Sequence, residues 1–134
     1  MKSWPTIDIP PVGFDFPELK LKSTWGKSIQ RKQYVSYVCG ITPYDATHLG
    51  HALTYLVFDL VNRYQLLAGK QINFIENVTD VDDPLFERAN RDHIDWRDLA
   101  IDQISLFTRD MTTLRILPPR QFDLVSETID LVIN

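Results

Sequence analysis

Cysteine is nearly absent from this 134-residue chain, which contains a single one, Cys39. One cysteine cannot close an internal disulfide, so the disulfide-stapled extracellular domains are excluded and a reducing compartment is favoured. The opening residues, Met-Lys-Ser-Trp-Pro, also lack the apolar stretch of a signal peptide. The longest apolar region, residues 53–67, is interrupted by Asp59, Asn62 and Arg63 and is too short to span a membrane. These absences predict a cytoplasmic protein without a membrane segment.

An excess of positive charge is missing as well, because 14 Lys and Arg stand against 18 Asp and Glu, for a formal net charge of −4. Without a basic field the surface does not attract phosphate backbones, which disfavours nucleic acid as a nonspecific partner. Hydrophobic residues make up 44% of the chain and charged residues 24%, as in ordinary globular proteins. The length allows one domain with one packed core.

The first 33 residues contain four of the eight prolines, at positions 5, 10, 11 and 17. Proline fixes φ and removes a backbone donor, so residues 1–33 are expected to form an extended N-terminal arm that lies on another part of the protein. Short edge strands are expected around Leu19, Leu21 and Ile29. Trp25 is interpreted as a packing residue of this arm.

A strand, a helix and a second strand follow in close succession. Residues 34–39 are β-branched and aromatic and precede a glycine, and residues 71–77 form a similar run. Between them, residues 47–68 have the apolar periodicity of an amphipathic helix, with Gly69 as its stop. Such a succession predicts a right-handed parallel crossover, and hence a Rossmann-like α/β half-sheet. The apolar stripe of this helix, interpreted as core, consists of Leu49, Leu53, Leu56, Val57, Leu60, Val61, Tyr64 and Leu67.

Three further helices are expected toward the C-terminus. Asp83 before Pro84 predicts an N-cap and a proline at the first helical position, with the helix running to about Arg91. Asp95 opens the next helix, which the prolines at 118 and 119 end, and Asp123 opens the last. The buried face of the middle helix is expected to carry Ala100, Ile104, Phe107, Met111 and Leu114.

The most informative segment is residues 39–52, between the first strand and the first helix. A glycine-containing turn that leads into a helix N-terminus offers backbone N–H groups and a positive dipole end, which together favour a phosphate. His48 and His51 are three residues apart, so both imidazoles lie on one face of the first turn. Gly50 lacks a Cβ, and an adenine or ribose ring is expected to lie flat on the helix start there.

In this segment the chain resembles the class I aminoacyl-tRNA synthetases, whose first signature is the histidine-glycine-histidine turn. Within them it is similar to the cysteine-activating branch, which couples Cys39 and Gly40 to that turn and continues with the Asn-Val-Thr-Asp-Val-Asp-Asp run of residues 77–83. The resemblance covers essentially the whole chain and is strongest over residues 37–91. It implies a class I synthetase fold, here a parallel β-α-β half-domain with additional C-terminal helices.

Two kinds of enzyme share this pattern, one that passes cysteine to its tRNA and one that passes it to the amine of glucosaminyl-inositol in mycothiol biosynthesis. Ile41, Pro43 and Leu53 resemble the second kind, as does the Pro-Leu-Phe-Glu-Arg-Ala run of residues 84–89. The ligase is therefore the favoured interpretation, and an N-terminal fragment of a cysteinyl-tRNA synthetase is the alternative.

The resemblance implies that cysteine attacks ATP to form cysteinyl-adenylate and pyrophosphate, and that an amine then accepts the cysteinyl group. His48 and His51 would be catalytic, holding the phosphates of ATP with its Mg²⁺. Cys39 would bind Zn²⁺ and, through it, the substrate thiolate, since Zn²⁺ favours sulfur ligands. The contacts with substrate and adenylate would come from Cys39, Gly40, Ile41, Thr42, Thr54, Asn77, Val78 and Thr79.

Family members continue into a second half of the sheet that supplies further zinc ligands and a Lys-Met-Ser-Lys-Ser loop, neither of which occurs within these 134 residues. Zinc needs about three protein ligands, and one thiolate does not suffice. Residues 34–134 are therefore expected to be the truncated N-terminal part of a class I catalytic domain. We expect the chain alone to be a poor ligase, completed by pairing with a C-terminal half.

Several of these residues also have plainer interpretations. The thiol of Cys39 is also typical of a packed strand end, and the two histidines of a helix cap. A third hypothesis is thus an inactive remnant that binds a nucleotide, or a partner protein through its open sheet edge. Thr54 fits a helix surface equally well. Three aspartates, Asp80, Asp82 and Asp83, are assigned to turns and caps in preference to Mg²⁺, and a solvated charged face is assigned to Arg88, Arg91, Asp92 and Arg97.

Overall fold

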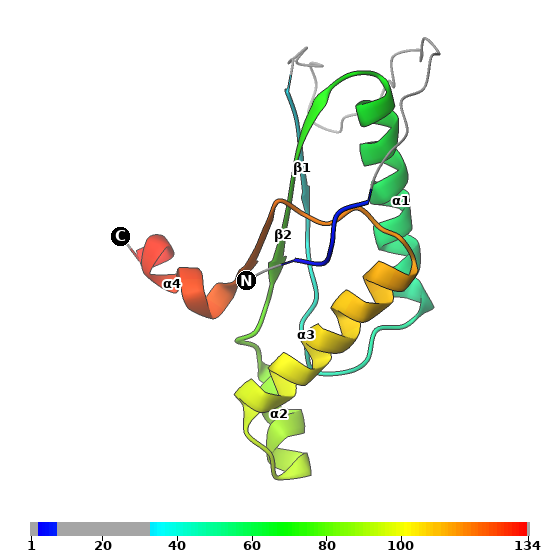
Figure 1. Ribbon diagram of the computed structural model, residues 1–134. Helices are drawn as coiled ribbons and strands as arrows, with labels where there is room; N and C mark the ends of the chain where they lie inside the picture. The colour runs from blue at the N-terminus through cyan, green and yellow to red at the C-terminus, as the bar shows by residue number, and fades with distance from the viewer. Residues whose placement is uncertain (1–2, 8–32, 134) are drawn as a thin grey trace.

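The computed structural model describes residues 3–7 and 33–133, and its centre is a parallel three-stranded sheet (Figure 1). The strands lie in the order β1 (Gln33–Val38), β2 (Gln71–Val78) and β3 (Gln121–Leu124). The first two strands confirm the sequence prediction: β1 lies one residue earlier than predicted, and β2 ends one residue later. With helices packed on the sheet, the architecture is α/β and Rossmann-like.

The third strand differs from the sequence prediction, which placed a helix from Asp123 onward. Gln121 to Leu124 instead pair with β2, from Ile75 opposite Gln121 to Val78 opposite Leu124. Four residues are too few to produce a recognisable alternation, and the strand passes directly into α4 (Val125–Ile133). The expected helix therefore begins two residues later, after a strand that the sequence did not indicate.

Helix α1 (Leu49–Leu67) connects β1 to β2 and runs in the opposite direction along the sheet (Figure 1). His48 caps its N-terminus, and Gly69 follows its end with a φ of +75°, which confirms the predicted stop. The carboxyl ends of β1 and β2 and the start of α1 consequently point toward the same end of the sheet, the end nearer to α2 in Figure 1.

The face that α1 turns to the sheet was predicted wrongly. The residues buried from this helix are Tyr55, Asp59, Asn62 and Gln65, most of them polar. Asp59 accepts hydrogen bonds from the Leu117 amide (2.8 Å) and from Arg63 Nε (2.6 Å), which hold the polar face inward. Much of the predicted core stripe is exposed, and we call this part the outer stripe of α1: Leu49, Leu53, Leu56, Val57 and Leu60.

Two further helices, α2 (Asp83–Asp92) and α3 (Trp96–Thr113), follow β2. The cap of α2 is Asp82, one residue before the predicted Asp83, whereas Asp95 caps α3 as predicted. The buried residues of α3 are Leu99, Ala100, Ile104, Phe107 and Met111.

The C-terminus of α3 lies earlier than the proline pair indicated. Leu114 is the C-cap and is partly exposed, so it does not belong to the buried face. Arg115 follows with a φ of +57°, which turns the chain out of the helix before either proline is reached.

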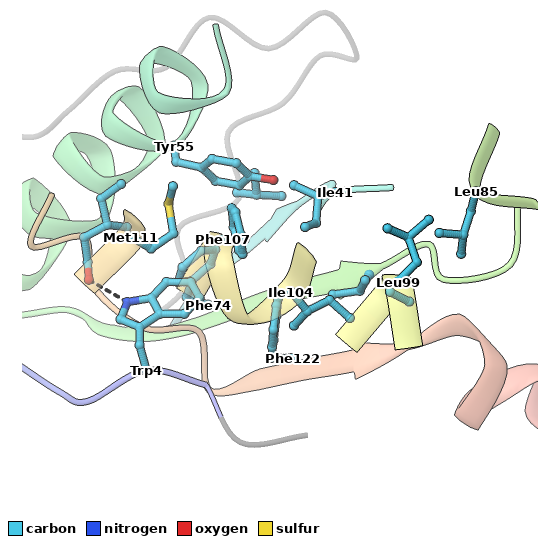
Figure 2. Packing of buried hydrophobic residues seen from close by; sticks show 14 of the residues in the cluster. Trp4, Ile41, Tyr55, Phe74, Leu85, Leu99, Ile104, Phe107, Met111 and Phe122 are labelled. Atoms are coloured by element: carbon cyan, nitrogen blue, oxygen red, sulfur yellow. Dashed lines mark hydrogen bonds between the residues drawn. The ribbon is translucent and has the colours of Figure 1, made fainter. Parts of the chain in front are cut away.

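The core lies between the sheet and α1, α2 and α3. Trp4, from the N-terminal segment, packs into this core (Figure 2). The Trp4 ring makes edge contacts with Phe107 and Phe122, at centroid distances of 5.9 and 5.8 Å, and its indole N–H donates to the Ile116 carbonyl (2.8 Å). The predicted arm is described only over residues 3–7. Its expected strands and Trp25 lie outside the described residues.

The aspartates after β2 are engaged with backbone groups. Asp80 is buried and accepts hydrogen bonds from the amide and the hydroxyl of Ser126 in the first turn of α4. Together with the Asp82 cap, this agrees with the assignment to turns and caps. Across residues 3–7 and 33–133, no helix is both long and apolar enough to pass through a lipid bilayer.

Candidate active site

A cavity of about 260 Å³ lies where β1 ends and α1 begins. Five of the residues predicted to act on the substrates line it. Its lining consists of Gly40, Ile41, Thr42, Tyr44, Asp45, Ala46, Thr47, His48 and His51. The position agrees with the general rule that ligands of open α/β sheets bind beyond the carboxyl ends of the strands.

The two histidines cap α1 through one atom of each ring. His48 Nδ1 accepts from the Gly50 amide (3.0 Å), and His51 Nδ1 accepts from the His48 amide (3.3 Å). A neutral imidazole that accepts at Nδ1 carries its proton on Nε2. Burial, and then the neighbouring His48, lower the pKa of His51, which favours this neutral form. Both rings are thereby left with an Nε2–H donor for an anion.

Gly50 has a structural role that the sequence did not indicate. A Cβ at this position would lie 2.8 Å from Cε1 and 2.9 Å from Nδ1 of His48. The glycine therefore leaves room for the His48 ring to fold back onto the helix start. The proposed contact with an adenine or ribose ring stays a prediction.

Asn77 organises the junction between the two strand ends. Its Oδ1 accepts from Tyr37 Oη (2.8 Å) and from the Gly40 amide (3.3 Å), and its Nδ2 donates to Thr79 Oγ1 (3.4 Å). The Thr79 amide in turn donates to the Ile41 carbonyl (2.9 Å). The Asn77 side chain thus fixes the cavity wall, and any contact that it makes with an adenylate stays a prediction.

Gly40 lies so close to β2 that no larger residue fits. A Cβ at this position would be 1.5 Å from the Asn77 carbonyl oxygen and 3.3 Å from Glu76 Cγ. The φ of Gly40 is not positive, so space and not backbone conformation requires the glycine.

The thiol of Cys39 is exposed at the end of β1, one residue before the cavity lining. The backbone carbonyl of Cys39 accepts a hydrogen bond from Tyr55 Oη (3.3 Å). The exposure of the Cys39 thiol agrees better with a ligand-binding role than with packing in the core. Among the described residues, no three His, Cys, Asp or Glu side chains are close enough to hold a metal ion together.

The other predicted contacts lie outside the cavity lining. Thr54 is exposed and donates back to the Gly50 carbonyl (3.2 Å), as its plainer interpretation expected. Val78 is fully buried, so no part of it is exposed to a ligand. Neither residue lines the cavity, and their substrate contacts stay predictions.

Sequence reasoning missed the side chains that hold the cavity loop from outside. Asp110 of α3 accepts from Thr47 Oγ1 (2.8 Å). Arg88 of α2, assigned to a solvated face, donates to the loop at Asp45. Both partners are far from the loop in sequence, and no local pattern indicates such pairs.

Glu76 carries a buried carboxyl group on β2, in register with Val38 at the end of β1. It is 0% exposed, and neither carboxyl oxygen has a hydrogen-bond partner of acceptable geometry among the described residues. Burial raises the pKa of Glu76 to about 8, and the nearby Tyr55 hydroxyl offsets only part of this shift. Glu76 is therefore mainly a neutral acid at pH 7.

The chain is similar to curated ligases of cysteine. It is 50% identical to the L-cysteine:1D-myo-inositol 2-amino-2-deoxy-alpha-D-glucopyranoside ligase of Gordonia bronchialis, over 100% of this chain and 33% of that protein. The ligase of the same name from Mycobacterium ulcerans is 49% identical, over 98% of this chain and 34% of the relative. The chain thus spans about a third of the length of these relatives.

A solved structure and a family pattern agree with this similarity. Mycobacterium tuberculosis methionyl-tRNA synthetase, in complex with methionyl-adenylate, shares the fold with a TM-score of 0.60 and 24% identity, over 64% of this chain and 17% of that one. Residues 26–134 match the family described as tRNA synthetases class I (C) catalytic domain. The chain therefore belongs to this family of class I synthetase catalytic domains.

Proposed function

We propose that the chain is the N-terminal part of an ATP-dependent ligase that activates L-cysteine and transfers it to the amine of glucosaminyl-inositol, a step of mycothiol biosynthesis. The observation that carries the proposal is the arrangement of an exposed Cys39 beside a cavity with two Nε2–H donors. The names of the relatives support the choice of both substrates.

The cavity suits the first step of such a reaction. A cysteine carboxylate oxygen attacks the α-phosphorus of ATP, and the bond to the bridging oxygen breaks to release pyrophosphate. Negative charge grows on the phosphate oxygens, where the Nε2–H groups of His48 and His51 and the N-terminus of α1 stabilise it. In the second step the acceptor amine attacks the cysteinyl carbonyl, loses a proton and releases AMP. Mg²⁺ would accompany the triphosphate.

Zinc is proposed only with ligands from outside the described residues. The exposed thiol of Cys39 has the right chemistry for one Zn²⁺ ligand, but the described residues do not complete a site. We therefore assign no step to the metal. The use of ATP and of a free thiol favours the cytoplasm as the site of action.

A further polypeptide segment is proposed to complete the domain. Among the described strands β1 has one open edge, and the outer stripe of α1 leaves Leu49 88%, Leu53 66% and Leu60 69% exposed. Apolar stripes and open edges are usually covered. The two-thirds of the relatives that this chain does not match would supply such a cover.

The test is complementation. The chain is produced alone and together with the unmatched C-terminal two-thirds of the Gordonia bronchialis relative, and cysteine-dependent ATP–pyrophosphate exchange is measured. We expect exchange from the pair, little from the chain alone, and none from the pair with Cys39→Ser. Product formation with glucosaminyl-inositol identifies the acceptor. A pair that copurifies without exchange contradicts the ligase and favours an inactive binding module.

Charging of cysteine tRNA is the second candidate activity, favoured by the family description. The same complemented pair is given cysteine tRNA in place of the amino sugar. Charging of the tRNA, with no product from glucosaminyl-inositol, would replace the ligase by the synthetase.

His48 is predicted to have two separable functions. His48→Ala removes the cap and the Nε2–H donor, and is expected to lower the free energy of unfolding by about 1 kcal/mol and to weaken ATP binding by roughly tenfold. His48→Asn keeps a strong capping side chain, so stability should be largely retained while the tenfold loss of ATP affinity persists. Chemical denaturation and calorimetry with ATP measure the two effects. Full ATP affinity in His48→Asn would contradict the phosphate contact.

A further inference from the structure

The electrostatics of the cavity conflict with the proposed triphosphate. Among the described residues that line the cavity, Asp45 is the only one with a carboxylate, and none is a lysine or an arginine. An uncompensated carboxylate there would repel the phosphates of ATP, since like charges at a surface interact by about 1 kcal/mol or more at short range. The cavity therefore needs a cation placed close to Asp45.

Arg88 lies at that place. From α2, its Nη1 donates to Asp45 Oδ1 (2.8 Å) and to the Tyr44 carbonyl (2.6 Å). Its Nε donates to Asp92 Oδ2 (3.2 Å), one turn further along the same helix. The Arg88 side chain is only 25% exposed, although it lies on the polar side of α2. One guanidinium thus joins the loop at the cavity to a fixed helix.

We propose that Arg88 is a positioning residue of the nucleotide cavity, which cancels the charge of Asp45 and holds the Tyr44 carbonyl so that a triphosphate can enter. The inference rests on the proposed use of ATP. It assigns Arg88 no contact with the reacting atoms. A planar guanidinium can bond a carboxylate and a carbonyl together, which a lysine ammonium does with less geometric control.

Arg91 provides a matched control on the same helix. It also pairs with Asp92, at 2.7 Å from Nε to Oδ1, but its side chain is 70% exposed and it has no described hydrogen bond to the cavity loop. Arg91→Gln removes the same charge from α2 as Arg88→Gln does. A difference between the two variants therefore reports the contact with Asp45 and Tyr44, and not the net charge of the helix.

The experiment measures equilibrium binding of ATP and of adenosine to the whole chain in about 50 mM salt, where surface charges are weakly screened. We expect Arg88→Gln to weaken ATP binding by roughly fivefold to tenfold and Arg91→Gln by no more than about twofold. Adenosine, which has no phosphate, should bind all three proteins equally. The double variant Arg88→Gln with Asp45→Asn should regain ATP affinity to within about twofold of the original chain.

Each other outcome overturns the inference. Equal ATP affinities of the two arginine variants would remove the special role of Arg88. A parallel loss of adenosine binding would mark the effect as structural only, and failure of Asp45→Asn to restore affinity would exclude charge cancellation. If the unaltered chain binds adenosine but no ATP, the proposed triphosphate site itself is contradicted, and the role of Arg88 falls with it.

Discussion

Gly40→Ala is expected to lower the free energy of unfolding by about 3 kcal/mol or more, a large effect for one added methyl group. The new Cβ would lie 1.5 Å from the Asn77 carbonyl oxygen, far inside van der Waals contact. The clashing atom belongs to the backbone of β2, the central strand, so a change of side-chain rotamer does not relieve the clash. Either β1 moves away from β2 at its carboxyl end or the variant fails to fold.

Gly69→Ala is the matched control, because the two glycines are required for different reasons. Gly69 has a φ of +75°, and no atom in the described part of the chain lies within 4 Å of its Cβ position. Alanine there meets only the strain of the left-handed conformation, about 1 kcal/mol. Urea denaturation of both variants compares the stability lost through steric overlap at Gly40 with that lost through backbone strain at Gly69. Equal losses in the two variants would show that the strand ends separate easily.

Binding measurements extend this prediction to the candidate site. Gly40 is adjacent to Cys39 and lines the cavity, and its amide donates to Asn77 Oδ1. A displaced strand end would move the cavity wall relative to His48 and His51. We therefore expect Gly40→Ala to lose ATP binding under conditions where it is still folded, whereas Gly69→Ala binds ATP normally.

The local motifs were the part of the site that sequence could predict. His48 and His51 are three residues apart, and their spacing alone places both rings on the first turn of α1. Gly40 and Cys39 follow directly from the end of a recognisable strand. The contacts of Arg88 with Asp45 and of Thr47 with Asp110 depend on how α2 and α3 pack, and nothing near those residues in sequence specifies it.

Helix α1 shows why periodicity alone gives an incomplete fold. Its apolar repeat predicted a helix correctly, yet the sheet receives the polar face with Asp59 and Asn62, while the outer stripe of α1 remains exposed. A periodic pattern identifies a face that is buried somewhere, but not against which neighbour. The buried face was fixed by tertiary partners such as the Leu117 amide. The exposure of the outer stripe of α1 supports the proposal that a further polypeptide segment covers this face of the helix.

Glu76→Gln is expected to stabilise the protein increasingly as the pH rises. In the unfolded chain Glu76 loses its proton near its ordinary pKa of 4.5, whereas burial raises the pKa in the folded protein to about 8. Between these values the unfolded state binds fewer protons, so the free energy of unfolding falls with rising pH. At 1.36 kcal/mol per unit, this loss reaches about 3 kcal/mol at pH 7. Glutamine has no proton to lose and avoids it.

The stabilisation is measured by urea denaturation of the original chain and of Glu76→Gln at pH 5, 6, 7 and 8. The difference in free energy of unfolding should grow steadily over this range and flatten above pH 8. Glu87→Gln, at an exposed glutamate of α2, removes the same formal charge and should give a difference that hardly changes with pH. A constant difference for Glu76→Gln would mean that its carboxyl group is already ionised at pH 5 in the folded protein. In that case a hydrogen-bond donor such as the Tyr55 hydroxyl, a cation or water stabilises the charged form of the Glu76 carboxyl group enough to offset its burial.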